Sequence, residues 1–244
     1  MAVALGLLAL VIGALIGMVG VGGVLLPPGL VALGDLSVHE ATATSTWAFL
    51  FTGVVGTIAY ARQGVVPWPM LRRLGVGVVP AAFLGALVSA SLPATALMLG
   101  LAALTLLVGV NQLLPGARHL DVGELGTVPL VGIGAFVGLG SALTGTGGPV
   151  LLVPILLLLG VAPLKAVAVS QAVQLPVVVA GSIGFLQTGL VDVRLGTLLG
   201  VVAALGTVGG ALLATRVPGE ALRKVVACAC LAAGTLILVR LLVA

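Results

Sequence analysis

The chain repeats itself at a fixed offset of 125 residues. The clearest repeated element is a glycine pair inside a long apolar run, because Gly22-Gly23 returns as Gly147-Gly148. Without a gap, the same shift also superposes Ala41 on Ala166, Ser45 on Ser170, Gly56 on Gly181, Gly64 on Gly189 and Gly85 on Gly210. Such a duplication in an apolar chain is typical of membrane proteins built from two structural repeats.

The composition is that of an integral membrane protein. Hydrophobic residues make up 61% of the chain and charged residues 7%, against about 25% charged residues in soluble domains. The apolar runs are continuous rather than alternating, which favours membrane-spanning helices over strands. The net charge of +4 comes from Lys and Arg in short gaps between apolar runs, so we interpret it as a topology signal and not as a nucleic-acid site.

Charged residues and Pro/Gly breaks divide the sequence into eight apolar segments, four per repeat. They cover residues 2–34, 40–61, 67–91, 94–114, 127–160, 164–187, 191–215 and 218–243. We therefore expect an all-α polytopic membrane protein that forms one integrated membrane domain. Its first repeat is assigned to 1–115, its linker to 116–126 and its second repeat to 127–244.

The first segment of each repeat is too long for one crossing and is interrupted in its middle. A continuous helix over residues 2–34 would be about 50 Å long, against a bilayer core of about 30 Å. Gly20-Val21-Gly22-Gly23 interrupts the first of these segments, and the sequence from Thr144 to Pro149 interrupts the second. We predict two half-helices that meet at a glycine turn in each repeat.

The positive charges favour inverted repeats. If each pair of half-helices folds back as a V, eight of the ten Lys and Arg residues lie on one side of the membrane. If each pair instead crosses the membrane completely, six of these residues lie on one side and four on the other. The eight are Arg62, Arg72, Arg73, Arg118, Lys165, Arg216, Arg223 and Lys224. The inverted arrangement puts both termini on the outer side of the membrane.

The two glycine breaks are the first candidate for a binding site. Non-helical backbone at membrane depth must be covered by protein or by a water-filled cavity, so we expect both breaks to face the interior. A half-helix that starts there offers free N–H groups and a positive dipole end to an anion. The donors would be Gly22, Gly23, Gly147 and Gly148. Alternatively, the glycines only permit close helix packing, as we expect for Gly13/Gly17, Gly134/Gly138 and Gly206/Gly210.

Polar side chains near the breaks are the second candidate. Thr146 lies within the second break, and Ser45, Ser170 and Gln171 lie in the segments that follow the breaks. Their hydroxyl and amide groups could complete the hydrogen-bond shell of an anion, or they could bond to their own helices. His39 and Glu40 are interpreted as solvated helix ends, and a proton-coupling role for them is left open.

The sequence offers no chemistry for an enzyme. It contains no His/Glu pair at metal-ligand spacing, no nucleophile with a partnered base and no phosphate-binding loop. We therefore predict no catalytic residue, no metal site and no cofactor.

These residues together resemble a known family. The broken glycine segments with nearby prolines, the pattern Ala-x-Ala-x-Ser at 41–45 and 166–170, and the later Gly64 and Gly189 are similar to those of the sulfite exporter TauE/SafE family. The resemblance implies a secondary transporter of small sulfur-containing anions such as sulfite or organosulfonates. The first half departs from the pattern with Val21 in place of Thr146 and with Pro27-Pro28 together.

We predict a carrier in the cytoplasmic membrane of a prokaryote, with an anion site between the two breaks and alternating access about that site. An H+ or Na+ coupling ion and a homodimer are left open. An anion channel, a transporter of a different small solute, a membrane-embedded enzyme and a structural subunit are the alternatives.

Overall fold

The structure, a computed structural model, describes residues 2–88, 95–113 and 126–243. These residues form ten α-helices and one 3-10 helix and contain no strand. The first half comprises α1 (Ala2–Val19), η1 (Gly22–Leu25), α2 (Leu26–Gly34), α3 (Val38–Arg62), α4 (Trp68–Val88) and α5 (Thr95–Leu113). The second half comprises α6 (Thr127–Thr144), α7 (Pro149–Leu158), α8 (Pro163–Thr188), α9 (Val193–Arg216) and α10 (Gly219–Val243). All but the last residue of the predicted linker, 116–126, lies outside the described residues, and the division into repeats at that linker stays a prediction.

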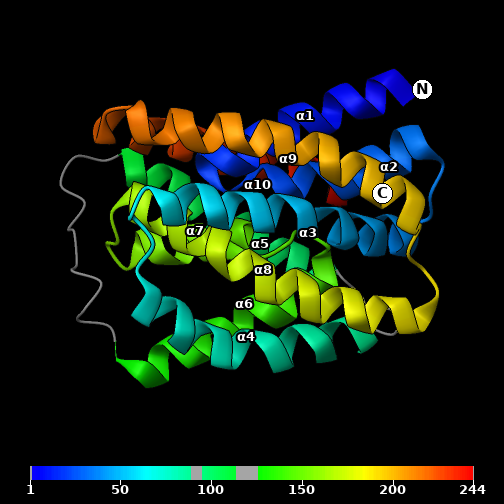
Figure 1. Cartoon of the computed structure of the whole chain (residues 1–244), viewed down its shortest axis with the longest axis horizontal. Coiled ribbons are helices and arrows are strands. Elements are labelled where there is room, and N and C mark those ends of the chain that lie inside the picture. Colours follow the sequence, from blue (N-terminus) through cyan, green and yellow to red (C-terminus); the bar gives the residue numbers. More distant parts are fainter. Residues whose placement is uncertain (1, 89–94, 114–125, 244) are drawn as a thin grey trace.

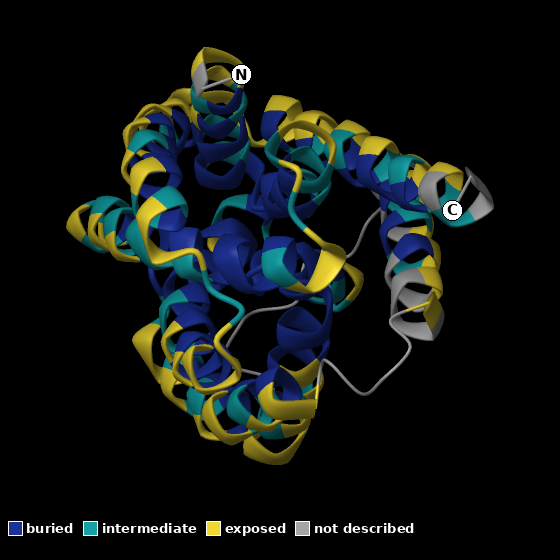
Figure 2. Cartoon of the chain, turned by 90° about the vertical axis from the view of Figure 1, so that its right-hand side faces the viewer, coloured by how far each residue is buried: buried dark blue, intermediate teal, exposed yellow. Residues whose placement is uncertain are grey.

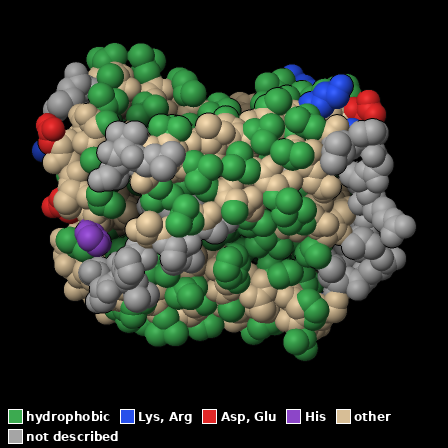
Figure 3. All heavy atoms as spheres, turned by 180° about the vertical axis from the view of Figure 1, so that it is seen from behind, with side chains coloured by type: hydrophobic (Ala, Val, Ile, Leu, Met, Phe, Trp, Pro, Cys, Tyr) green, Lys and Arg blue, Asp and Glu red, His purple; other side chains and the backbone are tan. Residues whose placement is uncertain are grey.

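The helices are those of a multi-pass membrane protein, as predicted. Six stretches are long and apolar enough to cross a membrane: α3, α4, α6, α8, α9 and Gly219–Val239 of α10. The outer surface carries many exposed Leu and Val side chains. Figure 3 shows a largely hydrophobic face with the visible charged side chains toward its two ends, as expected for a protein that a bilayer surrounds.

Helices are exchanged between the two halves of the chain. The antiparallel pair α3 and α8 lies in the centre, with α1 and α9 on one side and α4 and α6 on the other (Figure 1). Helix α1 of the first half therefore packs on α9 of the second, and α6 of the second packs on α4 of the first. Under the 125-residue shift these two contacts are equivalent, so the packing repeats together with the sequence.

Glycines bring the exchanged helices into backbone contact. Gly13 of α1 lies against the carbonyl of Ala203 on α9, and its equivalent Gly138 on α6 lies against the carbonyl of Val78 on α4. The other glycines predicted to pack, Gly17, Gly134, Gly206 and Gly210, also lie against backbone atoms of the facing helix. The small-residue packing prediction is confirmed.

Equivalent helices of the two repeats run in opposite directions. Along α3, Gly53 faces Gln174 and Leu175 of α8, whereas Gly56, further on, faces the earlier residue Gln171. The pair is therefore antiparallel, although α3 and α8 are equivalent under the duplication. Helices α5 and α10 are antiparallel by the same criterion, because Gly109 faces Ala227 and Gly234 faces Ala102. This is the geometry that an inverted duplication requires.

Candidate functional site

The second glycine break has the conformation that the sequence predicts. Helix α6 ends at Thr144, and Gly145, Gly147 and Gly148 have φ values of +65°, +78° and +105°. Side chains are disfavoured at such values, so these positions need glycine. Helix α7 then begins with Pro149 and has no side-chain cap. Within the described part of the chain, neither Gly147 nor Gly148 donates its N–H to another group, so the start of this helix keeps two backbone donors without a partner.

The first break differs from the second. Gly20, with φ +76°, follows the end of α1, and a 3-10 turn over Gly22–Leu25 then runs directly into α2. The prediction that the half-helix begins immediately after the glycine pair is wrong for the first break, because α2 begins four residues after Gly22. Pro27 and Pro28 lie in the first turn of α2, where their missing N–H groups remove two of the donors that a helix start normally offers.

The two breaks meet at the centre of the molecule. A Cβ added to Gly23 would lie 2.6 Å from the carbonyl oxygen of Thr146, so the backbones of the two breaks are in contact. The ring of Phe49 lies beside both Gly23 and Gly147, and Gly148 faces Gln174 on α8. Every residue from Thr144 to Pro149 is buried, within the buried interior that Figure 2 shows.

Hydroxyl groups surround the second break. The hydroxyl of Thr144 donates to the carbonyl of Gly140 at 2.7 Å and lies 2.9 Å from that of Thr146. On α3, Thr42 contacts Gly145 and Phe49 contacts Gly147; Ser45 lies between them on the same helical face. Ser45 is completely buried, and its hydroxyl has no partner among the described residues. The structure thus places Thr146, Gly147 and Gly148 together in the break, and the helical spacing puts Ser45 on the face of α3 that contacts it.

Ser170 and Gln171 lie away from that group. The Gln171 amide donates to the carbonyl of Ile16 near the end of α1 at 2.6 Å, and Thr57 of α3 donates to the backbone carbonyl of Gln171 at 3.3 Å. Ser170 is therefore level with Thr57, which lies 12 residues beyond Ser45 on α3. At 1.5 Å per residue the two serines are about 18 Å apart along the helix axis. One small anion cannot contact both.

Gln171 and Tyr60 satisfy the last carbonyls of α1. Tyr60 donates its hydroxyl to the carbonyl of Gly17 at 2.6 Å, beside the Gln171 bond to Ile16. The Ile16 carbonyl also accepts the N–H of Gly20 at 3.0 Å, and the Gly17 carbonyl lies where α1 ends and helical donors run out. Both side chains are completely buried, and they fix the end of α1 against α3 and α8.

Gln174 is a central residue that the predicted site omits. Its side-chain Nε2 donates to the carbonyl of Phe49 at 3.1 Å and to the hydroxyl of Thr52 at 2.7 Å, across the α3–α8 contact. Two sequence signals could have identified it: it is an amide in an otherwise apolar segment, and the duplication pairs it with Phe49.

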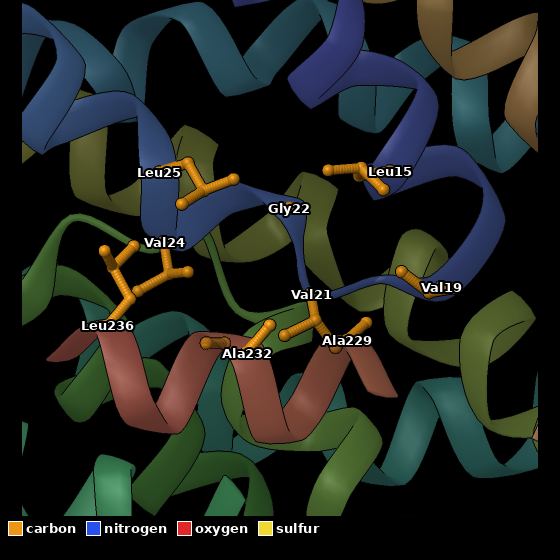
Figure 4. A pocket seen from close by; sticks show the side chains of 10 residues that line it. Leu15, Val19, Val21, Gly22, Val24, Leu25, Ala229, Ala232 and Leu236 are labelled. Atoms are coloured by element: carbon orange, nitrogen blue, oxygen red, sulfur yellow. The ribbon is translucent and has the colours of Figure 1, made fainter. Parts of the chain in front are cut away.

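A cavity of about 330 Å³ lies on the other side of the first break, against α10. Val21, Val24 and Leu25 of the break face Ala229, Ala232 and Leu236 across it (Figure 4). All of its lining side chains are apolar. This cavity is therefore unsuited to an anion, and it is separate from the hydroxyl groups around the second break.

The comparison with known proteins assigns the chain to a family. The family model described as sulfite exporter TauE/SafE matches residues 4–237. The chain belongs to the sulfite exporter TauE/SafE family. Members of the TauE/SafE family are membrane transporters and not enzymes, so the chain is a membrane transporter.

Two relatives of this TauE/SafE chain come from Bacillus subtilis (strain 168). The chain is 28% identical to the "Probable membrane transporter protein YunE" over 217 residues, which cover 78% of this chain and 79% of the relative. It is 27% identical to the "Probable membrane transporter protein YdhB" over 201 residues, which cover 76% of this chain and 79% of the relative. No solved structure matches the chain.

His39 and Glu40 of the TauE/SafE chain lie at a helix end, as predicted. His39 is exposed. Glu40 accepts hydrogen bonds from the N–H and the hydroxyl of Ser37, at 2.9 and 2.7 Å, and forms a capping box at the start of α3. This arrangement satisfies donors that the helix start would otherwise leave free.

The duplication in this TauE/SafE chain supplies a matched test of the Gln171 contact. We expect Gly56→Ala to lower the free energy of unfolding by about 1–3 kcal/mol, because the new methyl group would overlap the Gln171 side-chain oxygen and displace its bond to Ile16. The equivalent Gly181→Ala is expected to cost less, because its methyl would lie 3.3 Å from a methyl group of Thr46, which can move slightly. Thermal unfolding of both variants in detergent measures the difference; equal midpoints would contradict the assignment.

Proposed function

We propose that this TauE/SafE transporter carries small sulfur-containing anions, such as sulfite or organosulfonates, across the cytoplasmic membrane of a prokaryote by alternating access. The observation that carries the proposal is the second glycine break. There the uncapped start of α7 and the unbonded N–H groups of Gly147 and Gly148 are buried beside the hydroxyl groups of Ser45 and Thr146.

These groups suit an anion that must bind and also leave. A helix start carries about half a positive charge, and hydroxyl donors add hydrogen bonds without a full charge. Among the described residues, the buried polar side chains include no Lys, Arg or His. An anion is thus attracted without being held by an ion pair in a low-dielectric interior, where such a pair would be strong.

The rest of the proposed path follows from the arrangement of the repeats. Gly22 and Gly23 of the first break would complete the site from the opposite side, through backbone N–H groups. Ser170 and Gln171, about 18 Å from Ser45 along the helix axis, would act as a second polar position along the path rather than as ligands in the same site. Access would alternate as one group of helices rocks about the central α3–α8 pair, with H+ or Na+ as the coupling ion and with a homodimer as the assembly.

Uptake into proteoliposomes tests this proposal. Radiolabelled sulfite and organosulfonates are supplied outside, with and without a pH gradient, and with or without the same anion inside. We expect saturable uptake that an internal pool of the anion accelerates. The reason is that the binding site of a carrier returns to the outer side faster when an anion from the internal pool occupies it. Unsaturated flux without counterflow would instead indicate a channel, and no flux of any sulfur oxyanion by folded protein would refute the proposed substrate class.

A further inference from the structure

The amide of Gln174 has only one orientation that fits its surroundings. The carbonyl oxygen of Phe49 is a pure acceptor, so the Gln174 atom that faces it, at 3.1 Å, must be the N–H₂ group. The Thr52 hydroxyl donates its own hydrogen to the same Phe49 carbonyl at 3.2 Å, which leaves the hydroxyl oxygen to accept from Gln174. Both hydrogens of the amide nitrogen are therefore committed to protein acceptors.

The amide oxygen of Gln174 is left without a partner. The side chain is 1% exposed, and its Oε1 is buried with no hydrogen bond among the described residues. Gln174 also lies at the proposed site, because Gly148 at the start of α7 faces its Cα. An acceptor that stays buried and unpaired is costly, so a ligand that supplies a donor there gains affinity.

The charge of the site limits the ligand further. Only the start of α7, about half a positive charge, and neutral donors oppose a negative ligand, because no buried Lys, Arg or His occurs among the described residues. The single negative charge of a monoanion matches this limited positive charge. A dianion would bring a second charge into the interior without an opposing group, at high desolvation cost.

We infer that the transported species is a monoanion that carries its own hydrogen-bond donor. Hydrogensulfite, or a sulfonate with a hydroxyl or ammonium group, meets both conditions. Its anionic oxygens lie at the start of α7 near Gly147 and Gly148, and its donor bonds to Oε1 of Gln174. This inference rests on the proposed function, and it makes Gln174 the residue that selects among sulfur anions.

A pair of sulfonates that differ by one hydroxyl group tests the inference with the unaltered protein. 2-Hydroxyethanesulfonate and ethanesulfonate have the same charge and the same carbon chain, but only the first has a donor. We expect 2-hydroxyethanesulfonate to inhibit counterflow of labelled sulfite about tenfold more strongly, and sulfate, a dianion without a donor, to have no effect. Equal inhibition by the two sulfonates would overturn the inference.

Two variants assign the preference to Gln174. Gln174→Met has a similar length but no acceptor, so the tenfold preference should fall to about one while ethanesulfonate still inhibits. Thr52→Val is the control: it removes one bond that holds the amide nitrogen and leaves the Gln174 oxygen in place, so the preference should survive. A preference that persists in the Gln174→Met protein would also overturn the inference.

The outcomes separate this inference from the proposed function. Saturable sulfite counterflow without discrimination between the two sulfonates would retain the proposed function and reject the role of Gln174. Absence of counterflow for sulfite and for both sulfonates, in folded wild-type protein, would reject both.

Discussion

Replacing Gly147 by leucine is expected to abolish transport while leaving the protein folded in the membrane. A Cβ at Gly147 would lie 2.7 Å from the Phe49 ring, so the ring or the second break must move. The residue also has φ +78°, which side chains adopt only with strain. Uptake of labelled sulfite by proteoliposomes measures the loss, with the amount of folded protein determined by gel filtration. We expect less than about a hundredth of the wild-type rate, because a shift of binding groups by about 1 Å can reduce function about a hundredfold.

Gly189→Leu is the matched control for this experiment. Gly189 has nearly the same backbone conformation, with φ +70°, but a Cβ there would meet no atom within 4 Å. It therefore carries the strain of a side chain at positive φ without any contact at the break. We expect near-normal uptake from the Gly189→Leu protein. If the Gly147→Leu protein transports as well as this control, the second break is not the site.

Replacing Gly13 by leucine is expected to have the largest effect on folding. The new side chain would overlap the backbone carbonyl of Ala203, which cannot rotate away as a side chain could, so α1 and α9 must separate. We expect a loss of about 3 kcal/mol or more in the free energy of unfolding, at the upper end of the range for overpacked cores. The thermal midpoint in detergent and the yield of monodisperse protein measure it.

Gly6 on the same helix is the control for Gly13. No atom would lie within 4 Å of a Cβ at Gly6, so Gly6→Leu should be neutral or slightly stabilising, since leucine favours helix more than glycine does. The equivalent experiment in the second half uses Gly138, which faces the Val78 carbonyl, with Gly132 as the open position. Similar losses from Gly13→Leu and Gly6→Leu would contradict the proposed basis of the helix exchange.

Features with a strong local signature were predictable from the sequence. Both breaks were predicted from glycine pairs inside apolar segments that are too long for one crossing. Glycine destabilises a helix interior, and an uninterrupted helix of that length would exceed the bilayer core. Glycines four apart, such as Gly13 and Gly17, located the close helix contacts. Ser37 and Glu40 even have the spacing of a capping box, although this was not used in the prediction. In each case nearby residues determine the conformation.

The alignment of helices from the two halves along one another was not predictable. The duplication superposes Ser45 on Ser170, which suggested one shared site, but the antiparallel pairing of α3 and α8 carries equivalent residues to opposite sides of the centre. The same pairing brings Gln174 to the Phe49 carbonyl, although the two residues differ in chemistry and lie 125 positions apart. The offset between two antiparallel helices is set by their packed surfaces and leaves no periodic signal in either segment.

The exchange of helices also constrains how the protein is made. Helix α1 is synthesised well before α9, which covers its glycine face and begins only at Val193. At about 5–20 residues per second, the interval from Val19 to Val193 lasts roughly 10–35 s. During that time a backbone surface built for another helix faces lipid or the insertion machinery. The packing of α1 on α9 therefore delays the burial of this glycine surface until α9 has been synthesised.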